Sequence, residues 1–283
     1  RMSPKTFDGK AVIVTGSSSG IGRATAGLFA ASGAKVTLSG RNLEALESAR
    51  SSLVKAGSKP DDVIIVQGDV ADDAVASELV ERTVAAFGRL DVLVNNAAAL
   101  ETGQGTAANM DVKHFDHIMR VNVRQVILLT QLAAPHLAKT HGAVVNVSSI
   151  VAQPHQFPNH PFYSITKAAL DQVTVQMAAA LIKQGIRVNS VNPGLILTEL
   201  YVKNGMTEET SAKFFGRMNN SDIIPCGRHG EPEDAAKVIL FLANRNESEW
   251  VVGQKIFVDG GSSMKNNLLH TIGAVEDELA KSA

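Results

Sequence analysis

The stretch Ala11-Val12-Ile13-Val14-Thr15-Gly16-Ser17-Ser18-Ser19-Gly20-Ile21-Gly22 decides the fold of this chain. It joins an apolar run of strand length to a loop whose three glycines have the spacing Gly-x3-Gly-x-Gly. Glycine permits a tight turn and lets backbone N–H groups approach a pyrophosphate closely. A helix that begins at this loop adds the partial positive charge of its N-terminus. The stretch therefore predicts a strand, a phosphate-binding loop and a helix.

Strand and helix signals alternate along the rest of the chain. Short apolar runs rich in Val and Ile predict strands at Ala11–Thr15, Lys35–Ser39, Val63–Gln67, Asp91–Val94, Ala143–Val147, Arg187–Val191 and Lys255–Val258. Helical spacing predicts helices at Gly20–Ser32, Asn42–Ala56, Ala71–Phe87, Asp111–Lys139, Phe162–Gln184 and Glu231–Asn244. Such alternation gives right-handed βαβ crossovers, and continuously apolar strands suit burial on both faces. We predict an α/β fold, a single doubly wound domain over residues 1–283 with about seven parallel strands and helices on both faces.

Length and composition exclude several classes of protein. With 283 residues, 45% of them hydrophobic, and a formal net charge of −1, the chain can bury a core and lacks the basic excess of a nucleic-acid binder. No apolar run approaches the roughly 20 residues that span a bilayer, and the first residues lack the apolar segment of a secretory signal. The single cysteine, Cys226, can form neither an internal disulfide nor a Cys-based metal cluster. We expect a cytoplasmic protein with no membrane span and no nucleic-acid partner.

Two stretches depart from the alternation. Residues 196–225 form a long polar and aromatic excursion before the last predicted helix, and we interpret them as a substrate loop or lid. Residues 262–283 form a C-terminal tail about one helix long. An apolar substrate pocket is suggested by Leu100, Leu195, Leu200, Tyr201, Val202, Met206, Phe214 and Phe215.

The glycine loop also fits a rival motif. Gly16–Gly20 matches Gly-x-Ser-x-Gly, the nucleophile elbow of serine hydrolases, with Ser18 as the nucleophile. A hydrolase carries this elbow after several strands, whereas only one strand precedes it here. The phosphate-binding interpretation is therefore favoured over a hydrolase.

The end of the second predicted strand indicates which dinucleotide the loop would bind. An acidic residue there would hold the ribose 2′-hydroxyl of NAD, and a basic residue would accept the 2′-phosphate of NADP. The sequence reads Ser39-Gly40-Arg41 and contains no carboxylate, while Arg41 can bind a phosphate bidentately. We expect NADP rather than NAD.

Further short motifs follow the predicted strands. They are Asn95-Asn96-Ala97-Ala98, Val147-Ser148-Ser149, Asn192-Pro193-Gly194 and Asp259-Gly260-Gly261, together with Tyr163-Ser164-Ile165-Thr166-Lys167 at the start of a helix. In this order, and with the glycine loop, they make the chain resemble the short-chain dehydrogenase/reductase family over roughly residues 8 to 261. The resemblance implies a Rossmann-type fold and hydride transfer between a nicotinamide cofactor and a carbonyl or alcohol substrate.

The chemistry of such a reaction explains three of these residues. Hydride transfer to a ketone leaves an alkoxide, so a proton donor must lie against the carbonyl oxygen. Tyr163 can donate if its pKa, ordinarily about 10, is lowered. Lys167 lies four residues later on the same helical face, where its ammonium can stabilise a tyrosinate. A serine hydroxyl can hydrogen-bond the substrate oxygen as its charge develops.

The resemblance implies which other residues serve the site. It selects Ser149 as the serine that contacts substrate, with Ser148 as the alternative because the spacing to Tyr163 is one residue longer than in many members. It also implies that Asn122 links Lys167 to solvent through water as a proton relay. The residues that it implies for cofactor binding are Gly16, Ser18, Ser19, Gly20, Ile21, Arg41, Asp69, Val70, Asn96, Tyr163, Lys167, Pro193, Gly194 and Ile196.

Three functions are compatible with these observations. The first is an NADP-dependent carbonyl reductase or alcohol dehydrogenase with Tyr163 as proton donor and acceptor. The second is a non-catalytic nucleotide-binding member of the same fold, and the third is a serine hydrolase that uses Ser18. No metal is expected, because His114 and His117 lack a third converging ligand. The apolar circumference of Asp111–Lys139 and Phe162–Gln184, together with the resemblance, predicts a homo-oligomer, a tetramer.

Overall fold

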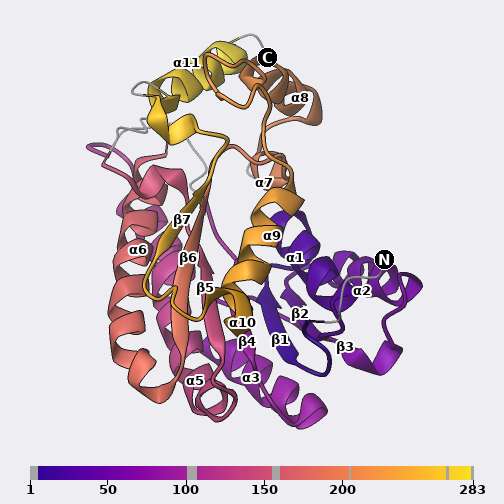
Figure 1. The fold of residues 1–283 in the computed structure, drawn as a ribbon. Helices are drawn as coiled ribbons and strands as arrows, with labels where there is room; N and C mark the ends of the chain where they lie inside the picture. The colour runs from indigo at the N-terminus through magenta and orange to yellow at the C-terminus, as the bar shows by residue number, and fades with distance from the viewer. Residues whose placement is uncertain (1–5, 101–106, 155–159, 204, 266–267, 282–283) are drawn as a thin grey trace.

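The computed structural model describes residues 6–100, 107–154, 160–203, 205–265 and 268–281. Its centre is one parallel sheet in the order β3-β2-β1-β4-β5-β6-β7 (Figure 1). The strands are β1 (Ala11–Thr15), β2 (Lys35–Gly40), β3 (Val63–Gln67), β4 (Val92–Asn95), β5 (Ala143–Val147), β6 (Arg187–Pro193) and β7 (Lys255–Val258). The strand order reverses between β1 and β4, which is where open α/β sheets bind their ligands, outside the carboxyl ends of the strands.

Helices cover both faces of the sheet. They are α1 (Gly20–Ala31), α2 (Leu43–Lys55), α3 (Asp73–Phe87), α4 (Val112–Met119), α5 (Gln125–Thr140), α6 (Pro161–Leu181), α7 (Leu200–Lys203), α8 (Glu208–Met218), α9 (Pro232–Ala243), α10 (Arg245–Ser248) and α11 (Leu268–Lys281). Helices α1, α2 and α9 pack on one face, and α3, α5 and α6 pack on the other (Figure 1). The predicted doubly wound α/β fold is confirmed.

The strand β1 shows why the apolar runs are continuous. Its alternate residues Val12 and Val14 pack against the α1, α2 and α9 layer, while Ile13 packs against the α3, α5 and α6 layer. All three side chains are fully buried because successive residues of a strand point to opposite faces. A sheet covered on both faces therefore leaves no position in β1 for a polar side chain directed to water.

The predicted helix Asp111–Lys139 is interrupted. The structure places a π-helical turn, Arg120–Arg124, between α4 and α5. Asn122, inside this turn, is 1% exposed. Its side-chain amide donates a hydrogen bond to the Ala99 carbonyl oxygen and accepts one from the Ala99 N–H. A π-turn widens the helix by one residue and is frequent at functional sites. Periodicity alone could not reveal it, because the apolar pattern continues on both sides.

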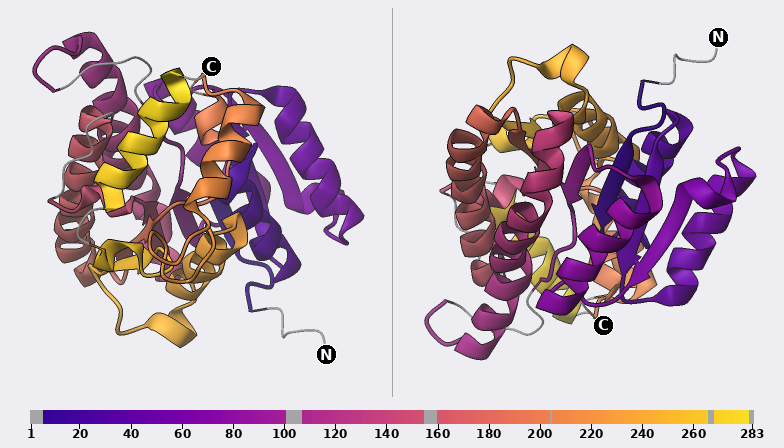
Figure 2. Two further views of the ribbon diagram at one scale, coloured as in Figure 1. Left: turned by 90° about the horizontal axis from the view of Figure 1, so that it is seen from above. Right: turned by 90° about the horizontal axis from the view of Figure 1, so that it is seen from below.

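The predicted lid and tail contain helices of their own. Helices α7 and α8 lie within 196–225, while residues 262–283 begin with a short 3₁₀ turn, Ser262–Met264, and continue into α11. Seen from above, α11 lies beside α8 beyond the carboxyl ends of the strands (Figure 2). Among the described residues, no helix is long and apolar enough to cross a membrane.

Candidate active site

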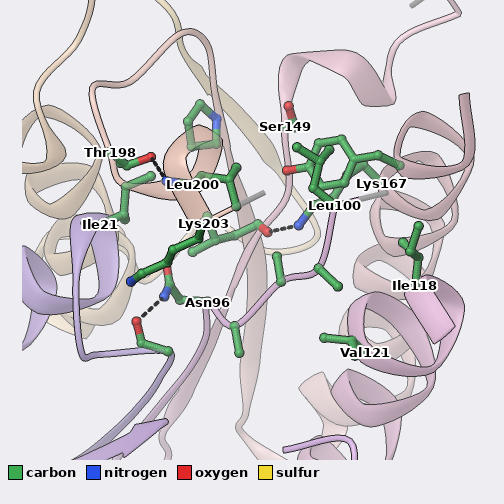
Figure 3. A pocket seen from close by; sticks show the side chains of 18 of the residues that line it. Ile21, Asn96, Leu100, Ile118, Val121, Ser149, Lys167, Thr198, Leu200 and Lys203 are labelled. Carbon is green, nitrogen blue, oxygen red and sulfur yellow. Dashed lines mark hydrogen bonds between the residues drawn. The ribbon is translucent and has the colours of Figure 1, made fainter. Parts of the chain in front are cut away.

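A cleft of about 470 Å³ opens at the carboxyl ends of the strands, at the reversal of strand order. It runs from the glycine loop, past the end of β4, to the start of α6 (Figure 3). The site residues predicted from the sequence that line it are Gly16, Ser18, Ser19, Gly20, Ile21, Arg41, Asp69, Val70, Asn96, Ser149, Tyr163, Lys167, Pro193, Gly194 and Ile196. Segments far apart in the chain are thus brought to one surface.

The glycine loop leaves its backbone close to the cleft. Gly16 and Gly20 have φ angles of +64° and +52°, in the left-handed region that glycine adopts without strain. A Cβ at Gly22 would lie 2.4 Å from the carbonyl oxygen of Gly16, so no larger residue fits without movement of the loop. The Ser17 hydroxyl accepts a hydrogen bond from the Ser39 N–H at 2.9 Å, which holds the loop against β2.

Asn96 fixes the end of β4 to the same loop. Its side-chain amide donates to the carbonyl oxygens of Thr15, at 2.8 Å, and Gly16, at 3.2 Å. The Thr15 hydroxyl in turn accepts from the backbone N–H groups of Asn96 and Ala97, both at 3.0 Å. The amide that the resemblance places beside the cofactor is therefore also a brace between two strand ends.

The end of β2 carries a cation and no acid of its own. Arg41 is one of the most exposed side chains of the cleft, with 77% of its side chain accessible, and a guanidinium nitrogen lies 4.0 Å from a carboxylate oxygen of Asp69. An exposed ion pair at that distance contributes little free energy. The Gln67 side chain donates to the Arg41 carbonyl oxygen at 3.1 Å and holds the backbone at this corner. The guanidinium is therefore available to an anionic ligand.

Lys167 is the buried charge of the site. It lies one helical turn after Tyr163 on α6, with Nζ 5.4 Å from the centre of the Tyr163 ring and 2.8 Å from the Val147 carbonyl oxygen, to which it donates. Its side chain is 2% exposed, and this burial lowers the pKa of Lys167 from 10.5 to about 8, an effect that the carboxylate of Asp171 partly opposes. The structure thus places a buried amine beside the Tyr163 ring.

Two adjacent serines lie at the end of β5, and the structure distinguishes them. The Ser148 hydroxyl, 3% exposed, donates to the Lys167 carbonyl oxygen at 3.3 Å. The Ser149 hydroxyl lies at the cleft (Figure 3) and accepts a hydrogen bond from the Val151 N–H at 3.3 Å. Asn192 holds this residue by donating to the Ser149 carbonyl oxygen at 3.1 Å. Both serines line the cleft, but the Ser148 hydroxyl is buried and donates to backbone, which leaves Ser149 as the more accessible of the two.

Asn122 lies behind the cleft rather than in its wall. Its amide donates to the Ala99 carbonyl oxygen at 2.9 Å and to the Thr166 hydroxyl at 3.0 Å, and its oxygen accepts from the Ala99 N–H at 2.8 Å. These bonds join the segment after β4 to the helix that carries Tyr163 and Lys167. The relay through water that the resemblance implies stays a prediction.

Comparison with known proteins identifies the family. Residues 16–263 match the family model described as enoyl-(acyl carrier protein) reductase. The 3-oxoacyl-(acyl-carrier-protein) reductase of Thermotoga maritima is 38% identical over 256 residues, which cover 90% of this chain and 98% of that protein. The chain belongs to the short-chain dehydrogenase/reductase family.

Solved structures of this family agree with the fold. A short-chain dehydrogenase/reductase from Caenorhabditis elegans, crystallised with cofactor, superposes with a TM-score of 0.90 at 43% identity, covering 92% of this chain and 97% of that chain. L-sorbose reductase from Gluconobacter frateurii, complexed with NADPH and L-sorbose, superposes with a TM-score of 0.81 at 31% identity. The match covers 91% of this chain and 97% of that chain. The predicted family is confirmed, and the chain is an NAD(P)-dependent oxidoreductase of the short-chain dehydrogenase/reductase class.

Sequence reasoning missed several lining residues of the cleft. Lys203 on α7 donates from Nζ to the Ser19 hydroxyl at 2.6 Å and pairs with Glu199 at 2.9 Å, so a lid residue reaches the glycine loop. Thr198 lies near Gly20, and Ile272 enters from the C-terminal helix. Only the folded chain brings these together, and no local motif marks them.

The predicted apolar pocket is correct in part. Leu100, Leu195, Leu200 and Tyr201 line the cleft. The other four residues, Val202, Met206, Phe214 and Phe215, do not line it. Of these, Phe214 and Phe215 are 0% and 3% exposed and form part of the apolar core of the lid. The aromatic pair faces inward because α8 is amphipathic and needs an apolar face to pack.

Histidine side chains also line the cleft. His114, His117 and His160 line it, whereas His155 falls outside the described residues. Within the ranges that the structure describes, no group of three or more His, Cys, Asp or Glu side chains is placed to hold a metal ion.

Proposed function

We propose that this chain is an NADP-dependent carbonyl reductase and secondary alcohol dehydrogenase. The observation that carries the proposal is the continuity of one cleft from the glycine loop to Ser149, Tyr163 and Lys167. Nucleotide-binding backbone at one end and a proton-donating constellation at the other are what a hydride transfer from a dinucleotide requires.

The residues of the cleft fit a dinucleotide. Gly22 packs closely against Gly16, and Gly16 and Gly20 have positive φ angles. The loop therefore presents side-chain-free backbone that a diphosphate can approach closely at the N-terminus of α1. Arg41 and Asp69 border the far end, and Pro193 and Gly194 border the middle. Bound there, a nicotinamide dinucleotide would supply or accept the hydride.

The protein's own residues would handle the proton. Tyr163 would donate its phenolic proton to the oxygen of the reduced carbonyl, and Lys167 would lower the energy of the resulting tyrosinate. The Ser149 hydroxyl would hydrogen-bond the same substrate oxygen and hold it toward the phenol. Asn122 would hold the segment after β4 against the start of α6 through its hydrogen bonds to Ala99 and Thr166. In alcohol oxidation the same proton returns to the tyrosinate.

The preference for NADP rests on the end of β2. The exposed guanidinium of Arg41 is held only by a long ion pair, and the turn Ser39-Gly40-Arg41 offers no carboxylate to a 2′-hydroxyl. A panel of ketones and secondary alcohols assayed with NADPH, NADH and their oxidised forms tests both parts. We expect turnover with a higher kcat/KM for NADPH, and activity confined to NADH would contradict the cofactor proposal.

The two alternative functions have less support. A non-catalytic member of the fold would have no use for Ser149, Tyr163 and Lys167 gathered at one end of a cleft. A serine hydrolase using Ser18 does not agree with the family, whose relatives carry oxidoreductase and dehydrogenase names. Labelling of Ser18 by a fluorophosphonate, absent in Ser18→Ala, would be the result that revives the hydrolase.

We also propose that the protein assembles as a homotetramer. An exposed stripe on α6 consists of Ile165, Ala168, Gln172, Val175 and Ala179, spaced three and four residues apart. The side chains of Ile165 and Val175 are 46% and 36% exposed, and pairing of two copies would bury them. Light scattering at micromolar concentration tests this, and a mass near 29.9 kDa would contradict it.

A further inference from the structure

We propose that the C-terminal helix α11 roofs the substrate half of the cleft and selects substrates that carry an apolar group beside the reacting carbonyl or alcohol. Ile272 is the residue of α11 that would contact this group. The inference rests on the proposed function, because it assigns a substrate class to the same cleft.

The position of Ile272 is the first support. It lines the cleft and is only 3% exposed, although it lies in the C-terminal tail, well beyond the end of β7 at Val258. It packs in one apolar cluster with Ile150, Leu195, Phe214 and Phe215. Ile150 and Leu195 also line the cleft and follow directly on Ser149 and Gly194. The roof is therefore continuous with the walls that flank the reacting centre.

The attachment of α11 to the lid is the second support. Leu279 lies about two helical turns after Ile272 on α11, is 6% exposed and belongs to the same apolar cluster. Arg217 on α8 and Glu278 on α11 form a bidentate ion pair, with nitrogen–oxygen distances of 2.8 and 3.1 Å. Exposed ion pairs add little free energy, so apolar burial holds α11 in place while the bidentate pair orients it against α8. Figures 1 and 2 show the two helices together above the sheet.

The extent of the family match is the third support. The match ends at residue 263, and α11 begins at Leu268. The roof is thus contributed by a segment beyond the residues that match the family model, where a substrate preference of this chain can be built without change to Tyr163 or Lys167.

The chemistry of the roofed space selects the substrate class. Next to Ser149 and Tyr163, the cleft is lined by the aliphatic side chains of Ile150, Leu195 and Ile272, and its polar lining includes His160. A polyhydroxylated substrate would place hydroxyl groups against the three aliphatic side chains, which offer no hydrogen-bond partner, and this is unfavourable. An alkyl or cyclic hydrocarbon substituent would instead gain from burial. The substrate class is therefore an apolar ketone or secondary alcohol rather than a sugar.

The test compares methyl ketones of increasing chain length with L-sorbose, using full-length protein and NADPH. We expect wild-type kcat/KM to rise by about fourfold per buried methylene, and to be lowest for the sugar. In Ile272→Ala the ratio of kcat/KM for a seven-carbon chain to that for butanone should fall by roughly tenfold. Leu279→Ala is the matched control, since it removes a buried aliphatic side chain from the same helix without touching the cleft, and should keep the wild-type ratio.

A second measurement separates this inference from the proposed reaction. The midpoint of thermal unfolding is recorded with oxidised NADP and the long-chain ketone, a pair that cannot react. Wild type and Leu279→Ala should be stabilised by the ketone, and Ile272→Ala should be stabilised less. Stabilisation by the ketone that depends on Ile272, without any turnover, would refute the proposed reaction but support the proposed role of α11. Equal ratios and equal stabilisation in the Ile272 and Leu279 variants, or a preference for L-sorbose, would overturn the roof.

Discussion

Replacing Lys167 by methionine tests the electrostatic cost of the buried ammonium. Methionine keeps a similar volume and removes the charge and the bond to the Val147 carbonyl oxygen. The pKa of Lys167 is lowered from 10.5 to about 8 by burial, which at roughly 1.4 kcal/mol per pKa unit amounts to about 3 kcal/mol against the folded state. The lost hydrogen bond costs about 1–3 kcal/mol. We therefore expect the variant to be inactive and at least as stable as wild type near neutral pH.

The pH dependence gives the sharper result. Because the unfolded chain binds this proton more tightly, the ammonium destabilises the folded state fully below about pH 8, and the effect disappears as pH rises toward 10.5. From about pH 7 to about pH 10 the free energy of unfolding of wild type should gain about 2–3 kcal/mol relative to Lys167→Met. Urea denaturation without nucleotide measures this difference, in which the titration of all other groups cancels.

The control for this experiment is Tyr163→Phe. It removes a hydroxyl from the site but leaves Lys167 and its burial in place. Its stability should follow the wild-type pH profile, although its activity is lost. A difference between wild type and Lys167→Met that stays flat across this pH range would refute the account of a strained, buried ammonium.

Three further substitutions test the cofactor end of the cleft. Arg41→Asp should reverse the coenzyme preference in kcat/KM, because the carboxylate repels a 2′-phosphate and accepts a hydrogen bond from a 2′-hydroxyl; an unchanged preference would exclude Arg41. Gly22→Ala should weaken NADPH binding roughly tenfold or more, seen in the fluorescence of bound NADPH, because its Cβ would lie 2.4 Å from the Gly16 oxygen. Lys203→Met should weaken binding about fivefold through loss of a cation beside the glycine loop. Lys213→Met, from the similar i,i+4 pair with Glu209, is its control, and equal effects of both would refute a specific role.

The sheet could be predicted from the sequence because both of its faces are buried. The predicted bounds of β1, Ala11–Thr15, and of β7, Lys255–Val258, are those of the structure. Every residue of β1 is buried, so its continuous apolar pattern carries the information. The residues of the edge strand β7 alternate between exposed and half-buried, and this strand is marked instead by its β-branched and aromatic residues. The order β3-β2-β1-β4-β5-β6-β7 was not predicted, because the local apolar pattern does not say which strands are neighbours.

The roof and the π-turn could not be predicted in the same way. Ile272 is one apolar residue in an amphipathic tail, and only the packing of α11 on α8 directs it to the cleft. Asn122 was selected by motif, but the turn that aims it depends on its bonds to Ala99. Phe214 and Phe215 were expected in the pocket wall and are core residues of the lid, because amphipathic spacing does not say which of two apolar surroundings a side chain enters.

The central claim is that Tyr163 transfers the proton at the substrate oxygen. The most direct measurement is kcat for NADPH oxidation with an apolar ketone, in wild type and Tyr163→Phe, together with the NADPH dissociation constant of each. We predict a loss of about 10²–10⁴-fold in kcat, with the dissociation constant unchanged, because only the proton donor is removed. Turnover of Tyr163→Phe close to that of wild type would contradict the account.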